Sequence, residues 1–205
     1  MTQLDSNPVT GGYVCAPYLH NHNSIELKDT WAHSRNIEDM YFVTATFSQE
    51  SKPYFSSSAN HYILAKFKDN KKILKEVEKF NQEKASFVFT MYDDLFEREG
   101  LGKTNFVSVY YLEYSESFDD FSEVANIIAK RNKVGKAGMG HMDLYCTETP
   151  KFTFPYNDHI VVLEVSSEDS HQKINKYCEK TRRAVSRKGI TMTNLVSLSI
   201  LEKLK

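Results

Sequence analysis

The pattern of apolar and polar positions is clearest in the second half of the chain. Four segments alternate in polarity or run apolar, with many β-branched and aromatic residues, and are predicted strands: 105–115, 141–149, 159–165 and 190–201. Two others repeat apolar positions at helical spacing and are predicted helices: 117–131 and 169–187. This order of strands and helices is that of a ferredoxin-like βαββαβ unit. The glycine-rich residues 135–140 are interpreted as a flexible turn.

A weaker copy of the same pattern occupies the first half. Its predicted strands are 10–18, 40–47, 60–64 and 85–92, and its predicted helices are 26–35 and 70–81. Two copies of one unit favour duplication rather than a longer repeat array. We therefore expect an α+β fold of two tandem ferredoxin-like halves, whose antiparallel sheets face each other in a barrel with the helices outside. The N-terminal half would span 1–95, the linker 96–104 and the C-terminal half 105–205.

Composition and charge limit the classes of partner. The chain has 205 residues, with 26 basic and 27 acidic ones, and shows no basic stripe, so no nucleic-acid partner is predicted. No apolar run is long enough for a membrane span, and the N-terminus has no signal-peptide pattern. Cys15, Cys146 and Cys178 lack any CxxC spacing and are expected to be reduced core thiols. Together these features predict a cytoplasmic protein.

The repeat, with a histidine entering an apolar strand at both His61 and His159, resembles the dimeric α/β-barrel superfamily in a fused form. That resemblance implies two facing sheets with a small hydrophobic ligand, often aromatic, between them. Members include cofactor-independent monooxygenases, polyketide cyclases, haem-degrading and haem-binding proteins, and stress-response barrels. No catalytic signature of any branch is matched. Because family barrels close by pairing two units, this chain is expected to be a monomer, with a homodimer as the other state.

Alternation along the strand 141–149 identifies the first candidate site. His141, Asp143 and Tyr145 share one face, and the apolar Met142 and Leu144 share the other, which is expected to pack under the helices. The polar face would then look between the sheets. A carboxylate near an imidazole suits a general base that removes a phenol or enol proton. The alternative is a polar group at a strand end that is hydrogen-bonded to loop backbone.

The same reasoning predicts residues that line the ligand. They are Ser108, Tyr110, Tyr114, Tyr62, Lys66 and Glu164. Lys66 and Glu164 occupy equivalent positions in the two copies, each on the alternate face of an apolar strand. A charge between the sheets is costly to desolvate. We expect the two to approach each other or share a polar region, or else to reach solvent separately.

Metal and cofactor sites have little support in the sequence. His20 and His22, with His33 further on, lack the third or fourth ligand of a zinc site at a familiar spacing, so no metal is predicted. No cofactor is predicted either; haem is the alternative, with His33 beside Trp31 as its candidate axial ligand. Two functions stay open. One is a monooxygenase- or cyclase-like enzyme, and the other is a non-catalytic ligand-binding or stress-response barrel.

Overall fold

The computed structural model describes the backbone of residues 11–49, 59–69, 72, 75, 86–97, 103–114, 136–145, 152–153, 160–185 and 190–205, and the side chains of a smaller set within these ranges. The described strands are β1 Gly12–Tyr18, β2 Ile37–Phe47, β3 His61–Phe67, β4 Ser86–Glu97, β5 Phe106–Tyr114, β6 Lys136–Tyr145, β7 Phe152–Thr153, β8 Ile160–Val165 and β9 Ile190–Lys203. The described helices are α1 His22–His33 and α4 Glu168–Val185. The fold class is α+β, as predicted.

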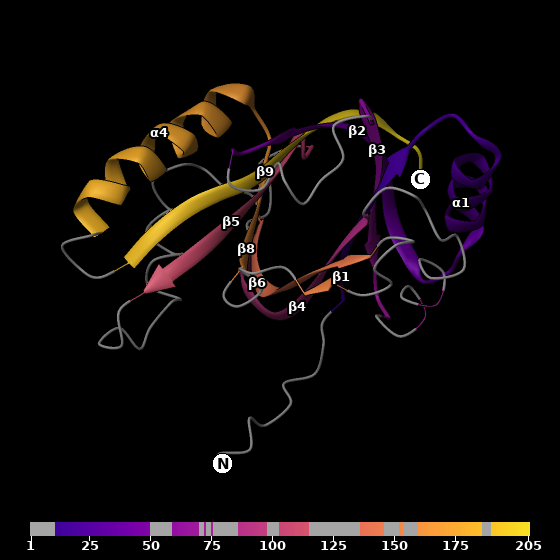
Figure 1. Cartoon of the computed structure of the whole chain (residues 1–205), viewed down its shortest axis with the longest axis horizontal. Helices are drawn as coiled ribbons and strands as arrows, with labels where there is room; N and C mark the ends of the chain where they lie inside the picture. The colour runs from indigo at the N-terminus through magenta and orange to yellow at the C-terminus, as the bar shows by residue number, and fades with distance from the viewer. Residues whose placement is uncertain are drawn as a thin grey trace, which may run out of the picture.

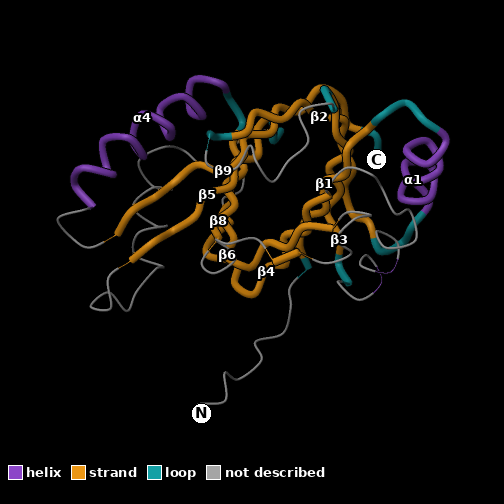
Figure 2. Tube along the Cα trace, in the orientation of Figure 1, coloured by secondary structure: helices purple, strands orange, loops and turns teal. Residues whose placement is uncertain are grey.

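The strands form one curled antiparallel sheet whose two ends meet. The strand order is β4-β1-β3-β2-β9-β5-β8-β6-β7, and β4 also pairs with β6. In the described part of the chain, that extra pairing closes a ring of eight strands, and β7 adds only a short extension to β6. Figures 1 and 2 show the ring, with α1 and α4 outside it on opposite sides.

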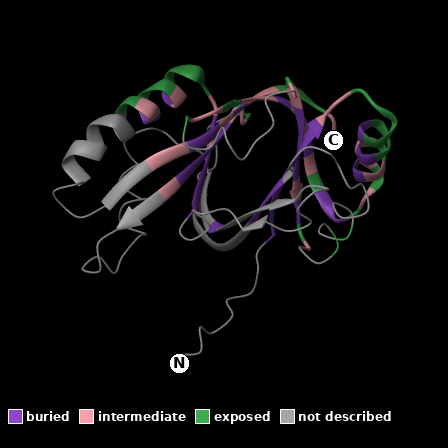
Figure 3. Cartoon of the chain, viewed as in Figure 1, coloured by how far each residue is buried: buried purple, intermediate pink, exposed green. Residues whose placement is uncertain are grey.

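Side chains that point into the ring form one apolar core. It contains Tyr13 and Cys15 of β1, Tyr62 and Leu64 of β3, and further buried residues of β2, β4, β5, β8 and β9. A second core lies outside the ring, where Leu27 and Trp31 of α1 pack on the opposite faces of β1, β2 and β3. Figure 3 shows buried residues along the strands of the ring and on α1. Alternation along each strand therefore divides its residues between two environments.

Local sequence explains where the helices begin. The side chain of Asn21 accepts a hydrogen bond from the backbone N–H of Ser24 at 2.8 Å, which caps α1. The hydroxyl of Ser167 accepts from the N–H of Ser170 at 3.2 Å just before α4. Glu168 and Asp169 then place negative charge in the first turn of α4, where the helix dipole stabilises it. None of the described helices is both long and apolar enough to cross a membrane.

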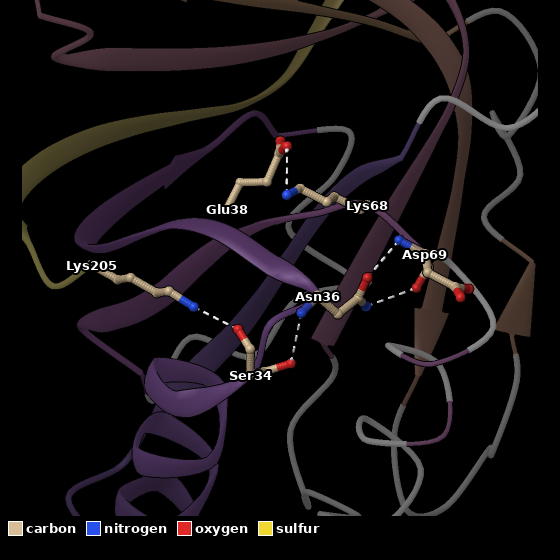
Figure 4. A network of polar contacts seen from close by, with 6 residues as sticks. All are labelled: Ser34, Asn36, Glu38, Lys68, Asp69 and Lys205. Carbon is tan, nitrogen blue, oxygen red and sulfur yellow. Dashed lines mark hydrogen bonds and ion pairs between the residues drawn. The ribbon is translucent and has the colours of Figure 1, made fainter.

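A polar network joins α1, β2 and the end of β3 (Figure 4). Asn36 is 8% exposed; its amide donates to the carbonyl of Asp69 at 2.9 Å and accepts from the N–H of Asp69 at 2.7 Å. The ammonium of Lys205 donates to the carbonyl of Ser34 at 2.5 Å, so that Lys205 also contacts the segment between α1 and β2. Lys68 and Glu38 add an ion pair of 3.6 Å near the surface.

One predicted element is wrong and others are not described. Residues 135–140 were interpreted as a turn, but Lys136–Gly140 belong to β6 and pair with both β4 and β8. Hydrogen bonds from two neighbouring strands override the low strand propensity of glycine there. The predicted helix 117–131, and all but two positions of the predicted helix 70–81, lie outside the described residues.

Candidate functional site at one end of the ring

One end of the ring carries polar side chains on its inner face. The starts of β1, β2 and β5 meet the ends of β3, β8 and β9 there, as the register shows: Tyr13 lies opposite Lys66, Tyr41 opposite Lys203 and Val107 opposite Glu164. We call this the polar end and define it by these side chains: Tyr13, Asp39, Tyr41, Lys66, Thr104, Glu164 and Lys203. The rest of the described inner face is apolar apart from the tips of a few aromatic residues.

Glu164 is the central carboxylate of the polar end. It is half-buried and shares the inner face of β8 with Ile160 and Val162. The Tyr13 hydroxyl, from the opposite side of the ring, donates to one of its oxygens, and the Thr104 hydroxyl donates to the other at 3.0 Å. Both donors are neutral, so hydrogen bonds rather than an ion pair stabilise the charge in this arrangement.

Tyr41 and Lys203 form the more exposed part of the polar end. The ammonium of Lys203 lies 2.6 Å from a carboxylate oxygen of Asp39 and 5.9 Å from the centre of the Tyr41 ring. Burial, followed by the charges of Asp39 and Glu164, raises the pKa of Tyr41 to about 12. Tyr41 is therefore a neutral hydrogen-bonding group at physiological pH.

Lys66 lies on the inner face, as alternation predicted. Its neighbours Tyr62 and Leu64 on β3 point into the ring, whereas Ile63 and Ala65 pack under α1. Lys66 and Glu164 thus occupy the same interior, but among the described residues no hydrogen bond or ion pair joins them. Glu164 is bonded to Tyr13 and Thr104 instead. Tyr62, also predicted to line the interior, is 1% exposed, and burial raises the pKa of its hydroxyl.

The three predicted catalytic residues lie on β6, and their side chains are outside the described set. The register places Asp143 opposite Val88, His141 opposite Thr90 and Tyr145 opposite Ser86. Val88 belongs to the core under α1, whereas its neighbours Phe87 and Phe89 belong to the core inside the ring. Positions opposite one another in an antiparallel pair share a face. The facing and the catalytic role of this set stay predictions.

Two predicted lining residues face away from the interior. On β5 the inner face carries Val107 and Val109, so Ser108 and Tyr110 lie on the outer face beneath α4, and the predicted facing is wrong for them. Both rows of this strand hold apolar and polar residues, so alternation alone could not choose between them. The side chain of Tyr114, which lies opposite Ile190, is outside the described set.

Ser108 and Tyr110 instead form a polar network with α4 that the sequence analysis missed. A hydrogen bond of 3.1 Å joins the Ser108 hydroxyl to Nδ1 of His171, and the Tyr110 hydroxyl donates to Oδ1 of Asn175 at 2.8 Å. The Asn175 amide lies 3.3 Å from Nε2 of His171, and the Phe106 ring stacks on the imidazole. The sequence signal that could have predicted this network is a histidine and an asparagine four residues apart, which share one face of a helix. Ser108 is fully buried, so this network holds α4 on the sheet rather than presenting a nucleophile.

Stability is expected to fall below neutral pH because of His171. Burial lowers the pKa of its imidazole, against a smaller opposing effect of Glu168. The unfolded chain therefore takes up the proton at a higher pH than the folded chain. As the pH falls, the free energy of unfolding begins to decrease near the pKa of histidine in the unfolded chain, about 6.5, and stops decreasing below the pKa in the folded chain. The slope is at most about 1.4 kcal/mol per pH unit.

Urea unfolding between pH 5 and 8 measures this effect. The His171→Gln variant should lose that part of the pH dependence, whereas His22→Gln, at a side chain that is 89% exposed, should keep it. Equal pH slopes for wild type and His171→Gln would contradict the assignment.

The described residues offer little to a metal or haem. No group of three or more His, Cys, Asp or Glu side chains among them is placed to hold a metal ion. His33, the candidate axial ligand, is exposed on the outer side of α1, and its Nδ1 lies 2.7 Å from the carbonyl of Asp29. It therefore does not fit a haem site inside the ring. Cys15 is fully buried in the inner core, and burial raises the pKa of its thiol, which keeps it protonated.

The fold defines the structural class of this protein. No family model matches the chain, and no curated protein does. A crystal structure provisionally named a chlorite dismutase matches it with a TM-score of 0.55 at 10% identity, over 94% of this chain and 96% of that one. A structure provisionally named a monooxygenase, from Fusobacterium nucleatum subsp. nucleatum ATCC 25586, has a TM-score of 0.47 at 11% identity, over 95% and 94% of the two chains. The curled antiparallel sheet with helices outside it agrees with the fold that the sequence resemblance implied; at 10% identity the likeness to this solved structure concerns the fold alone.

Proposed function

We propose that the chain is a small-molecule enzyme of the α/β-barrel type that acts at the polar end on a hydrophobic substrate, aromatic substrates included. The observation that carries this proposal is Glu164, a carboxylate inside an otherwise apolar ring and bonded only to neutral donors among the described residues. Such a carboxylate is suited to accept a proton from a phenol or enol hydroxyl. The electron-rich anion that results is the species on which a monooxygenase- or cyclase-like reaction would proceed.

The residues of the polar end have separate roles in this proposal. Glu164 is the proton acceptor, and the Tyr13 hydroxyl orients it by donating to one oxygen. The protonated hydroxyl of Tyr41 is available to donate to a substrate oxygen. Partly buried apolar side chains beside the inner core, such as Tyr41 and Ile200, would contact the hydrophobic body of the substrate, since removing apolar surface from water favours binding. His141, Asp143 and Tyr145 remain the sequence-based candidates for a catalytic role on β6.

A thermal-shift screen of phenols, polyphenols, flavins and haem tests the proposal, because a ligand raises apparent stability by mass action. Hits are then assayed for turnover, with oxygen consumption as one readout. We expect a phenolic or enolic ligand to bind the wild type and to lose turnover in Glu164→Gln. His141→Ala and Asp143→Ala, run in parallel, should also lose turnover if the β6 candidates act. Full turnover in Glu164→Gln would contradict the role of Glu164.

The second candidate function is a non-catalytic ligand-binding barrel. It is favoured by the tight filling of the inner face, where fourteen of the described core residues are each at most 4% exposed. A ligand would then be held at the polar end without chemistry. The same screen separates the two functions, since this one requires binding without turnover in the wild type.

We also propose that the ring consists of two tandem ferredoxin-like halves that work as one monomer. The strand orders β4-β1-β3-β2 and β9-β5-β8-β6 support this, because they repeat one arrangement in chain order. The pairings β2–β9 and β4–β6 join the two runs within one chain. A homodimer is then not needed to close the ring.

A further inference from the structure

Lys66 is a cation of the polar end whose ammonium has no bonding partner within the described part of the chain. It is half-buried on the inner face, with Tyr13 opposite it on β1 and Asp39 opposite it on β2. It forms no hydrogen bond or ion pair with any described residue. Removing part of the hydration of an ammonium group costs free energy unless another group replaces the lost water. An uncharged apolar side chain of similar length could occupy the position of Lys66 without that cost.

The acidic groups near Lys66 are engaged elsewhere. The carboxylate of Asp39 lies against the ammonium of Lys203 at 2.6 Å. The two oxygens of Glu164 accept hydrogen bonds from Tyr13 and Thr104. Apart from the Asp39–Lys203 ion pair, the described inner face therefore presents one ammonium, Lys66, and one carboxylate, Glu164, that do not form an ion pair with each other. Each retains bonding capacity, since an ammonium has three donors and each carboxylate oxygen can accept a second bond.

We propose that Lys66 binds the anionic group of the ligand, and that the ligand is a hydroxyaryl carboxylate whose hydroxyl reaches Glu164. This inference rests on the proposed function and narrows its substrate class. The aromatic body suits the apolar inner face, and the carboxylate suits an ammonium that bonds to no described residue. The hydroxyl supplies the proton that Glu164 accepts. A multiply charged anion is disfavoured, because Asp39 and Glu164 place negative charge at the same end.

Matched acids and esters test this assignment. The probes are 2-, 3- and 4-hydroxybenzoate and their methyl esters, which keep the ring and the hydroxyl but remove the negative charge. Calorimetry on the full chain should show at least one acid binding about tenfold or more tightly than its ester, the size expected for a charge-assisted hydrogen bond. Lys66→Met should abolish that preference and leave ester binding unchanged, whereas Lys66→Arg should retain most of it. The control is Lys68→Met, at a side chain that is 61% exposed and whose ammonium pairs with Glu38.

The outcomes separate this inference from the proposed function. If acid and ester bind equally in the wild type while Glu164→Gln weakens both, the site is correct and the anion assignment is overturned. If Lys66→Met keeps the preference for the acid, another cation binds the carboxylate and the assignment is again overturned. If no compound of the wider phenol and polyphenol screen binds the wild type, the proposed function fails and this inference fails with it.

Discussion

Replacing Gly12 by Ala should destabilise the fold by about 3 kcal/mol or more, which is among the largest effects expected of a single methyl group. A Cβ at this position would lie 1.9 Å from the carbonyl oxygen of Phe89 and 2.9 Å from the ring of Phe67. The first contact is with backbone and cannot be relieved by a side-chain rotation. β1 and β4 would have to separate where Gly12 lies opposite Thr90.

The position of Gly12 explains why the effect should spread through the fold. The pairing of β1 with β4 is one of the two that hold β4, and the other, with β6, closes the ring. A shift of β4 therefore disturbs both. For a chain of this length, a loss of 3 kcal/mol corresponds to a fall in Tm of about 6–12 °C. Differential scanning calorimetry measures it.

A suitable control for Gly12→Ala is Thr46→Ala, at an exposed position of β2. Its effect should stay within about 0.5 kcal/mol, as is usual for surface substitutions. If Gly12→Ala unfolds at the wild-type temperature, β1 and β4 do not approach as closely as the structure shows.

The second large effect concerns the hydrogen bond between Tyr13 and Glu164. Tyr13→Phe removes a donor from a half-buried carboxylate, and Glu164→Leu removes an acceptor from a hydroxyl whose side chain is 4% exposed. Each single change should cost about 1–3 kcal/mol, because it leaves one partner of the pair behind. The double variant leaves neither partner of this pair, and the Thr104 hydroxyl, which also loses its acceptor, is only part-buried. The stability of the double variant should therefore return to within about 1 kcal/mol of the wild type.

A double-mutant cycle by chemical denaturation measures this coupling. Tyr18→Phe combined with Glu164→Leu is the control, because Tyr18 lies at the other end of β1, where its ring contacts His20 and Phe42. That pair should be additive. Additive costs for Tyr13→Phe and Glu164→Leu would show that the two groups are not coupled.

The same double variant separates stability from function. All three variants of the pair should lose or weaken binding of the phenolic ligand, although the double variant folds as well as the wild type. If the double variant is as stable as the wild type, stability does not explain the presence of the Glu164 carboxylate. In our proposal its role is proton transfer. A double variant that binds and reacts normally would place the site elsewhere in the chain.

The sequence by itself determined the order of most of the described elements and, for several strands, which side chains share a face. Alternation placed Lys66 in the same row of β3 as Tyr62, and Glu164 in the same row of β8 as Ile160 and Val162, and these rows face the interior of the ring. Both strands are apolar on both rows, and the single charge in each one marks the row. The amphipathic pattern of α4 likewise predicted a helix on the outer side, as the structure shows. These features depend on neighbours within a few residues.

Only the tertiary structure decided which groups meet. Tyr13 reaches Glu164 across 151 positions of sequence, and no local pattern indicates that pairing. On β5 both rows contain apolar residues, so the facing of Ser108 and Tyr110 was decided by α4, which supplies His171 and Asn175 as partners. Residues 136–140 form a strand because β4 and β8 supply hydrogen bonds on both sides. Closure of the ring is a long-range event, whose energy comes from contacts between distant segments rather than from the preferences of any one of them.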